Sequence, residues 1–221
     1  MNSSVRTIFV AVLFALCIST AETRGESDEN AIRTCFKKYQ VAIANKDGKT
    51  TAGLVTKPTV SYFSGILKNA LDADEAKVKN LDFYRKMMVL LVRQELSDVY
   101  KTNGYSTNGL DFLALIIDRG WVGKVGAGNL ELGRVTMDDA DVFASAPGIL
   151  NGQPTPARFV FERTADGWKF DLLSVILRVN RLVREKEKNS SVNEDEAILQ
   201  RVEALSGRPI KKEIWKPMRG T

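Results

Sequence analysis

Charged side chains beside apolar segments are the first candidates for a binding or acid–base site in this sequence. Arg93 directly follows the all-apolar run 87–92, so a buried helix is expected to bring its guanidinium to the core. A desolvated arginine needs a carboxylate partner, and Asp111 and Asp118 lie on the next predicted helix. We predict that Arg93 pairs with Asp118 or Asp111 at a pocket or core edge. The alternative is that each of these side chains is solvated.

Two further candidates lie later in the chain. Trp121 stands in a glycine-rich segment and is a candidate pocket residue. In the last predicted strand, Trp168 and Phe170 share one face, while Lys169 and Asp171 share the other. Asp171 is a binding candidate if that polar face lines a concavity, and it has no such role if the face meets solvent.

The residue types exclude several chemistries. The chain has 221 residues, a net charge of +5 and no histidine. Ser-His-Asp and Cys-His catalysis and histidine-ligated zinc or haem are therefore ruled out. The glycine-rich segment 120–128 fails as a phosphate loop, because Val125 stands where the magnesium-binding Ser or Thr is required. We identify no catalytic residue and no metal ligand, and we expect no cofactor.

Residues 1–21 have the pattern of a secretory signal. Arg6 precedes an apolar run of 11 residues, and small residues follow it up to Ala21. The run is shorter than the ~20 apolar residues that a membrane-spanning helix needs. We predict a secreted, periplasmic protein. An uncleaved anchor and lipidation at Cys17 are the alternatives.

The basic surplus is concentrated at the C-terminal end. Segment 208–221 holds five basic residues and one acidic residue, so the rest of the cleaved chain is close to neutral. A neutral body argues against nucleic-acid binding. The tail either packs back on the domain, pinned by Trp215, or touches an anionic membrane surface. Cys35, the single thiol left after cleavage, lies in a helical apolar stripe and is predicted to be buried.

Hydrophobic periodicity predicts helices first, then strands, then helices. The helices are expected at 28–46, 58–71, 81–96, 110–118, 174–188 and 194–205, with a short helical turn at 50–55. The strands are expected at 130–137, 141–145, 158–163 and 168–173, with a proline-containing link at 146–156 and a tight turn at 164–167 that contains Asp-Gly. This order predicts an α+β fold, in which N-terminal helices pack on a curved antiparallel sheet of about four strands and two C-terminal helices follow.

The predicted organisation has five parts. They are a signal peptide (1–21), a polar leader (22–27), an α+β domain (28–173), a helical extension (174–207) and a basic tail (208–221).

The first helix and the last hairpin resemble the nuclear transport factor 2-like (SnoaL-like) superfamily. The residues concerned are Ala31-Ile32-Arg33, Tyr39, Ala42-Ile43 and Asp47-Gly48, and then Phe159 to Arg163 with Asp166 to Asp171. The resemblance implies a curved sheet wrapped by helices into a cone with an interior pocket. Members usually place two strands where 58–96 reads as helical here, which is a departure. Their His-Asp dyad is impossible in this chain, and no Tyr-Asp pair matches theirs.

We therefore expect a secreted, non-catalytic protein that binds a small apolar ligand or a protein partner. The alternative is a small-molecule enzyme of the isomerase or hydrolase type. It would use carboxylate acid–base chemistry in an apolar pocket, assisted by Tyr39 or Tyr62. Nucleic acid is not expected as a partner, while a homodimer and a weak membrane contact through 208–221 stay open.

Overall fold

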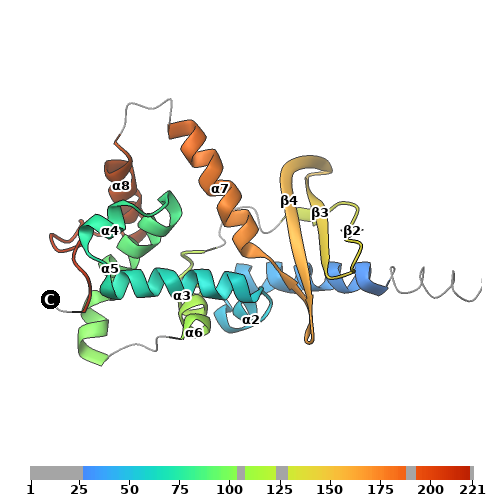
Figure 1. Cartoon of the computed structure of the whole chain (residues 1–221), viewed down its shortest axis with the longest axis horizontal. Coiled ribbons are helices and arrows are strands. Elements are labelled where there is room, and N and C mark those ends of the chain that lie inside the picture. The colour runs from blue at the N-terminus through green and yellow to red at the C-terminus, as the bar shows by residue number, and fades with distance from the viewer. Residues whose placement is uncertain (1–26, 104–107, 123–128, 188–192, 220–221) are drawn as a thin grey trace, which may run out of the picture.

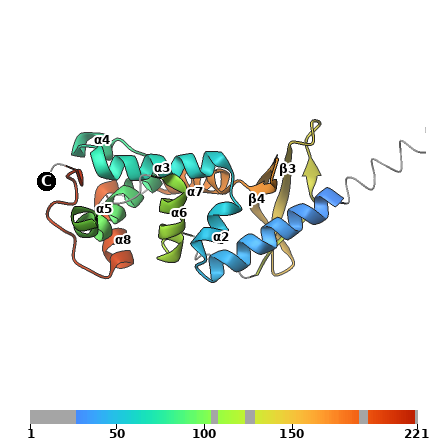
Figure 2. The ribbon, with the colours of Figure 1, turned by 90° about the horizontal axis from the view of Figure 1, so that it is seen from below.

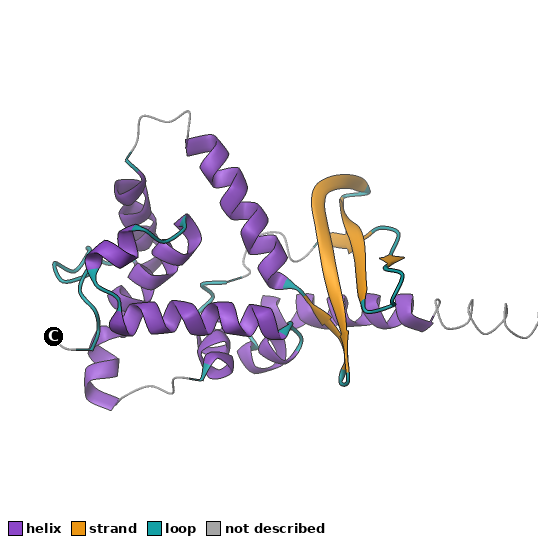
Figure 3. Cartoon of the chain, in the orientation of Figure 1, coloured by secondary structure: helices purple, strands orange, loops and turns teal. Residues whose placement is uncertain are grey.

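The computed structural model describes residues 27–103, 108–122, 129–187 and 193–219 (Figure 1). Its architecture is α+β, with helices first, an antiparallel sheet next and two helices last, as the sequence predicts. The strands gather at one end of the molecule and most of the helices at the other (Figure 3). The predicted signal, nearly all of the leader and most of the glycine-rich segment lie outside the described residues.

Helices make up the first half of the described chain and its C-terminal part. They are an N-terminal helix described over 27–44, α2 (Gly48–Gly53), α3 (Lys57–Asp72), α4 (Glu75–Lys79), α5 (Phe83–Asn103), α6 (Gly109–Asp118), α7 (Leu172–Glu187) and α8 (Glu194–Ser206). The side chains of Asp47, Asp74, Asn108 and Asn193 cap four of them by accepting hydrogen bonds from first-turn N–H groups. Pro58 lies in the first turn of α3, where a missing N–H leaves no helical bond unmade.

Five antiparallel strands form the sheet within the described residues. They are β1 (Leu130–Leu132), β2 (Thr136–Met137), β3 (Phe143–Leu150), β4 (Gln153–Thr164) and β5 (Gly167–Phe170), in the order β1-β3-β4-β5 with β2 also on β3. The predicted single strand at 130–137 is wrong, because β1 and β2 pair with different parts of β3. Gly133 lies between them and donates its N–H to the Pro147 carbonyl at 2.8 Å. A Cβ at Gly133 would stand 2.8 Å from the Pro147 ring, so the chain turns at a close approach that suits glycine.

The link predicted at 146–156 is also wrong, because β3 and β4 run through it as a hairpin. Asn151 and Gly152 have φ angles of 51° and 75°, as a two-residue type I′ turn requires. Pro154 belongs to a part of β4 that pairs with β3 on one side only, where a missing N–H is tolerated. The tight turn predicted through 164–167 is confirmed, with Ala165 and Asp166 as its central residues and Thr164 paired to Gly167.

The N-terminal helix lies across the sheet (Figure 2), and aromatic side chains join the two. The Phe36 ring lies 5.2 Å from the Phe159 ring and 5.7 Å from the Phe170 ring, measured between centroids. Cys35 is buried beside them, as predicted. This aromatic contact holds the N-terminal helix against the sheet.

The C-terminal segment 207–219 docks on α3 and α5. Ile214 and Met218 are buried, and the Met218 N–H donates to the Ala70 carbonyl at 3.1 Å. Lys211 pairs with Asp98 of α5 at 2.7 Å. The tail therefore packs back on the domain, one of the two predicted alternatives, and Ile214 and Met218 rather than the half-buried Trp215 anchor it most deeply.

Candidate functional site

A cavity of about 500 Å³ lies between the N-terminal helix, the sheet and α7. The two helices line it with side chains spaced three or four residues apart, namely Phe36, Tyr39, Gln40, Ile43, Leu172, Val175, Ile176 and Val179. The remaining lining comes from Tyr84, Gly120, Trp121, Val122, Leu130, Phe159, Phe170 and Leu205. The volume falls within the ~300–1,000 Å³ range of small-molecule pockets.

Aromatic rings form one wall of the cavity and fix its shape. The Tyr39 and Phe170 ring centroids are 4.7 Å apart, and Phe170 lies 5.8 Å from Phe159. Such contacts between tilted rings are favourable beyond the area they bury, so this wall is preformed. Val179 and Leu205, which also line the cavity, are 45% and 48% exposed, so part of the apolar lining meets solvent.

Two tyrosine hydroxyls are the neutral donors of this lining. Tyr39 is 7% exposed and Tyr84 is half-buried, and neither hydroxyl has a hydrogen-bond partner among the described residues. Burial raises the pKa of both tyrosines, so both phenols stay protonated at neutral pH. Each hydroxyl is available to an oxygen or nitrogen acceptor on a ligand.

The described lining of the cavity contains no aspartate or glutamate. The acid–base alternative requires a carboxyl group in an apolar pocket, where desolvation would hold it ready for proton transfer. Tyr39, which that alternative names as an assisting group, does line the cavity. It has no carboxylate beside it in the described lining to assist.

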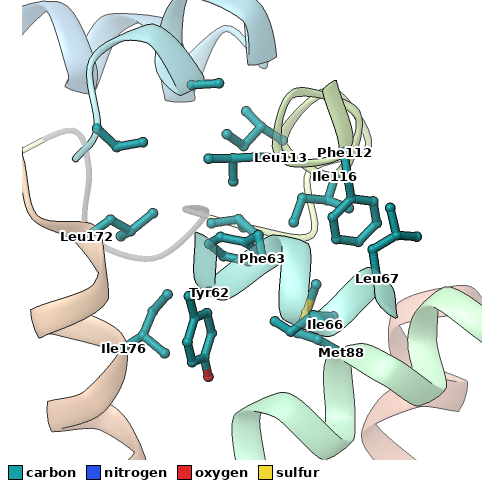
Figure 4. Packing of buried hydrophobic residues seen from close by; sticks show 14 of the residues in the cluster. Tyr62, Phe63, Ile66, Leu67, Met88, Phe112, Leu113, Ile116, Leu172 and Ile176 are labelled. Atoms are coloured by element: carbon teal, nitrogen blue, oxygen red, sulfur yellow. The ribbon is translucent and has the colours of Figure 1, made fainter. Parts of the chain in front are cut away.

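Tyr62 lies beside Ile176 of α7 and at the edge of the cluster that holds Phe63 and Ile66 (Figure 4), and it does not belong to the described cavity lining. Its hydroxyl is buried without a hydrogen-bond partner among the described residues. Burial raises the pKa of Tyr62 to about 12, and the Asp82 carboxylate adds to the rise. Folding therefore favours the neutral form of the Tyr62 phenol.

The stability of the chain at alkaline pH tests whether the buried Tyr62 phenol stays protonated. Above pH 10 the unfolded chain loses the Tyr62 proton while the folded chain keeps it until about pH 12, so the free energy of unfolding falls through this window. The Tyr62→Phe variant should therefore lose less stability than the wild type between these pH values, measured by urea unfolding. Comparing the two chains cancels other groups, including Arg93, whose lowered pKa acts with the opposite sign. Parallel pH profiles would contradict a protonated, buried phenol.

The predicted pairing of Arg93 with Asp118 or Asp111 is wrong. Arg93 is 2% exposed, and no ion pair joins it to a carboxylate within the described residues. Its guanidinium donates instead to main-chain carbonyl oxygens, those of Asn69, Ala70, Ala73, Ile214 and Trp215. Three of these belong to the C-terminal end of α3, where the helix dipole favours a cation. Burial nevertheless lowers the pKa of Arg93 to about 10.

The structure distributes the other predicted site residues over separate places. Trp121 lines the 500 Å³ cavity. Asp118 accepts a hydrogen bond from the Gly48 N–H at 2.7 Å and so ties α6 to the start of α2. Asp171 accepts from the Ser174 N–H at 3.3 Å, at the beginning of α7. Asp111 lines a second cavity of about 230 Å³ beside α3 and the tail.

Most of the cavity lining was missed by sequence reasoning. The apolar faces of the N-terminal helix and of the last hairpin are visible in the sequence as stripes, with Tyr39 and Phe170 among their members. A stripe predicts burial, but it carries no signal for a gap between two buried faces.

No helix among the described residues is long and apolar enough to cross a membrane. The same residues contain no group of three or more cysteine, aspartate or glutamate side chains arranged to hold a metal ion.

Comparison of the chain with models of known protein families, with curated proteins and with solved structures finds no match.

Proposed function

We propose that this chain is a non-catalytic binding protein that holds a small apolar ligand in the cavity between the N-terminal helix, the sheet and α7. The observation that carries the proposal is the composition of the lining. It is aliphatic and aromatic except for Gln40 and the hydroxyls of Tyr39 and Tyr84, and its described part carries no charged side chain. Pockets of this kind bind apolar bodies and orient them with a few polar groups.

The energetics favour a ligand with an extended apolar part. Each methylene moved from water into the cavity contributes about 0.8 kcal/mol. Gln40 is already committed to the sheet, because its amide donates to the Leu130 carbonyl at 2.6 Å. A single acceptor on the ligand would meet Tyr39 or Tyr84 instead. The binding affinity thus comes from the walls and the orientation from the phenols.

A bulky substitution on the cavity wall tests the proposal. N-phenyl-1-naphthylamine, a neutral apolar probe whose fluorescence rises in apolar surroundings, is titrated with the wild type. Val175→Trp places a large side chain on the wall formed by α7 and should weaken probe binding about tenfold or more, because the added volume occupies ligand space.

Leu177→Trp is the matched control. Leu177 lies on the same helix, is 51% exposed and does not belong to the cavity lining. This variant should bind the probe as the wild type does, with an unchanged far-ultraviolet circular dichroism spectrum for both variants. No probe binding by the wild type, or equal weakening by the two substitutions, would refute the proposal.

Two broader expectations belong to the same proposal. An interior cavity against a curled antiparallel sheet supports a distant relationship to the nuclear transport factor 2-like superfamily. The helical stretch that α3, α4 and α5 form, where members of that superfamily usually place two strands, marks a departure from it. The apolar run between Arg6 and Ala21 supports secretion to the periplasm.

A further inference from the structure

A polar groove of about 570 Å³ adjoins the apolar cavity. Phe36, Gln40 and Leu130 line both spaces, so the apolar wall continues directly into the groove. The groove adds charged and amide side chains, namely Arg33, Lys37, Asn129, Glu131 and Asn151. A ligand long enough to pass these three shared residues would meet an apolar surface at one end and a polar surface at the other.

The charges of the groove are not equally available. Arg33 is fixed, because it pairs with Glu29 at 2.7 Å and donates to the carbonyls of Leu132 and Gly133. Lys37 lies one turn further along the same helix, is exposed and takes part in no ion pair within the described residues. Glu131 is the acidic side chain of the described lining. Because Glu29 balances Arg33, the unpaired charges of the described lining are Lys37 and Glu131. Lys37 is the cation free to meet a ligand, and it follows Phe36 and precedes Gln40 on the helix, two of the three residues that line both spaces.

We infer that the ligand is a free single-chain amphiphile with an anionic head group, such as a fatty carboxylate. Its hydrocarbon chain lies in the cavity and its head group meets Lys37 in the groove. This inference rests on the proposed function. A carboxylate inside the cavity would lose its hydration without a charged partner, whereas in the groove it keeps water and gains the ammonium group. The cavity is of a size for one chain, which favours a monomeric fatty carboxylate over a bilayer lipid.

Displacement of bound N-phenyl-1-naphthylamine by two probes of equal chain length tests the charge of the head group. Dodecanoate is anionic and dodecyltrimethylammonium is cationic, and both are used as monomers at the same ionic strength. The concentration of dodecanoate that displaces half of the naphthylamine from the wild type should be about fivefold lower than that of dodecyltrimethylammonium. This ratio is the effect of one solvated ion pair. Lys37→Glu should abolish or reverse this preference, while displacement by neutral 1-dodecanol stays unchanged.

Lys38→Glu is the matched control, because Lys38 is the exposed neighbour in the same helix and does not line the groove. It should keep the wild-type preference. Equal displacement by the two charged probes in the wild type would overturn the inference alone, since the naphthylamine still occupies the cavity. An equal loss of the preference for dodecanoate in Lys37→Glu and Lys38→Glu would also overturn it, because the overall charge of the helix surface would then explain the preference. Failure of the naphthylamine to bind at all would refute the proposed function itself.

Discussion

Replacing Phe170 with alanine is expected to lower the free energy of unfolding by about 4 kcal/mol. The Phe170 ring is 2% exposed and has four other aromatic rings within 6 Å, those of Tyr39, Phe161, Phe36 and Phe159 at 4.7, 5.5, 5.7 and 5.8 Å. The substitution removes the ring that these four rings contact. The four cannot close the space left behind unless the N-terminal helix moves away from the sheet.

The main chain of Phe170 adds to this expectation. Its N–H donates to the Leu54 carbonyl at 2.8 Å, and its own carbonyl accepts from the Thr56 N–H at 3.1 Å. The residue thus links the segment between α2 and α3 to β5. A loosened side chain at this point should weaken the contact between the helical half and the sheet.

Urea unfolding measures the effect, and two variants bracket it. Phe170→Leu keeps most of the apolar volume and should cost about 1 kcal/mol. Phe143→Ala removes a phenylalanine that is 47% exposed in β3 and should change stability by no more than about 0.5 kcal/mol. Equal losses for Phe170→Ala and Phe143→Ala would show that the aromatic cluster does not join the two halves.

Replacing Arg93 with methionine is expected to cost about 3 kcal/mol. Methionine keeps an apolar stem of similar length, but it removes the guanidinium donors. The Asn69 and Ala70 carbonyls keep the N–H groups of Ala73 and Met218, whereas the Ala73 and Trp215 carbonyls lose the donors that Arg93 gives them. The Trp215 carbonyl, which accepts from Arg93 at 2.6 Å, belongs to the tail, while Asn69 and Ala70 belong to α3. Buried acceptors left without a donor cost about 1–3 kcal/mol each.

Two further variants separate the role of Arg93 from the general effect of removing a positive charge. Arg181→Met removes an exposed arginine of α7 and should stay within about 0.5 kcal/mol of the wild type in thermal or urea unfolding. Truncation after Gly207 removes two of the five carbonyl acceptors, so the losses from truncation and from Arg93→Met should not add. Full additivity, or a loss for Arg93→Met no larger than for Arg181→Met, would contradict the assigned role.

The helical part of the fold is predictable from the sequence because its signals are local. Asp47, Pro58 and Asp74 each mark a helix start by chemistry that needs no distant partner. The apolar stripe around Cys35 likewise marks the buried face of the N-terminal helix. The predicted ends are less accurate, since α5 continues to Asn103, well past residue 96.

The strands are predicted less well because prolines and a turn signal compete. Pro147, Pro154 and Pro156 favour a break, whereas Asn151-Gly152 favours a tight hairpin. The turn decides the outcome, and the strands tolerate the prolines through a register shift after Pro147 and a partly unpaired β4. Which side of a strand stays unpaired depends on the sheet order, which no local pattern contains.

The candidate site is the part that sequence reasoning reaches least. Of the predicted residues only Trp121 and Tyr39, the latter from the enzymatic alternative, line the cavity, because the walls come from segments more than a hundred residues apart. Arg93 shows the same difficulty in another form. Carbonyl oxygens are present at every residue, so the acceptors that replace the expected carboxylate leave no mark in the sequence.

The central claim is that the cavity between the N-terminal helix, the sheet and α7 binds an apolar chain. Methyl-resolved nuclear magnetic resonance, with 1-dodecanol titrated into the isotope-labelled chain, locates the binding place directly. The methyl groups of Ile43, Val175 and Ile176 should shift in a saturable manner, while those of Leu71 and Leu90, which are buried and do not line the cavity, stay in place. Saturable shifts at Leu71 and Leu90 without any at the cavity, or no shifts at all, would contradict the account.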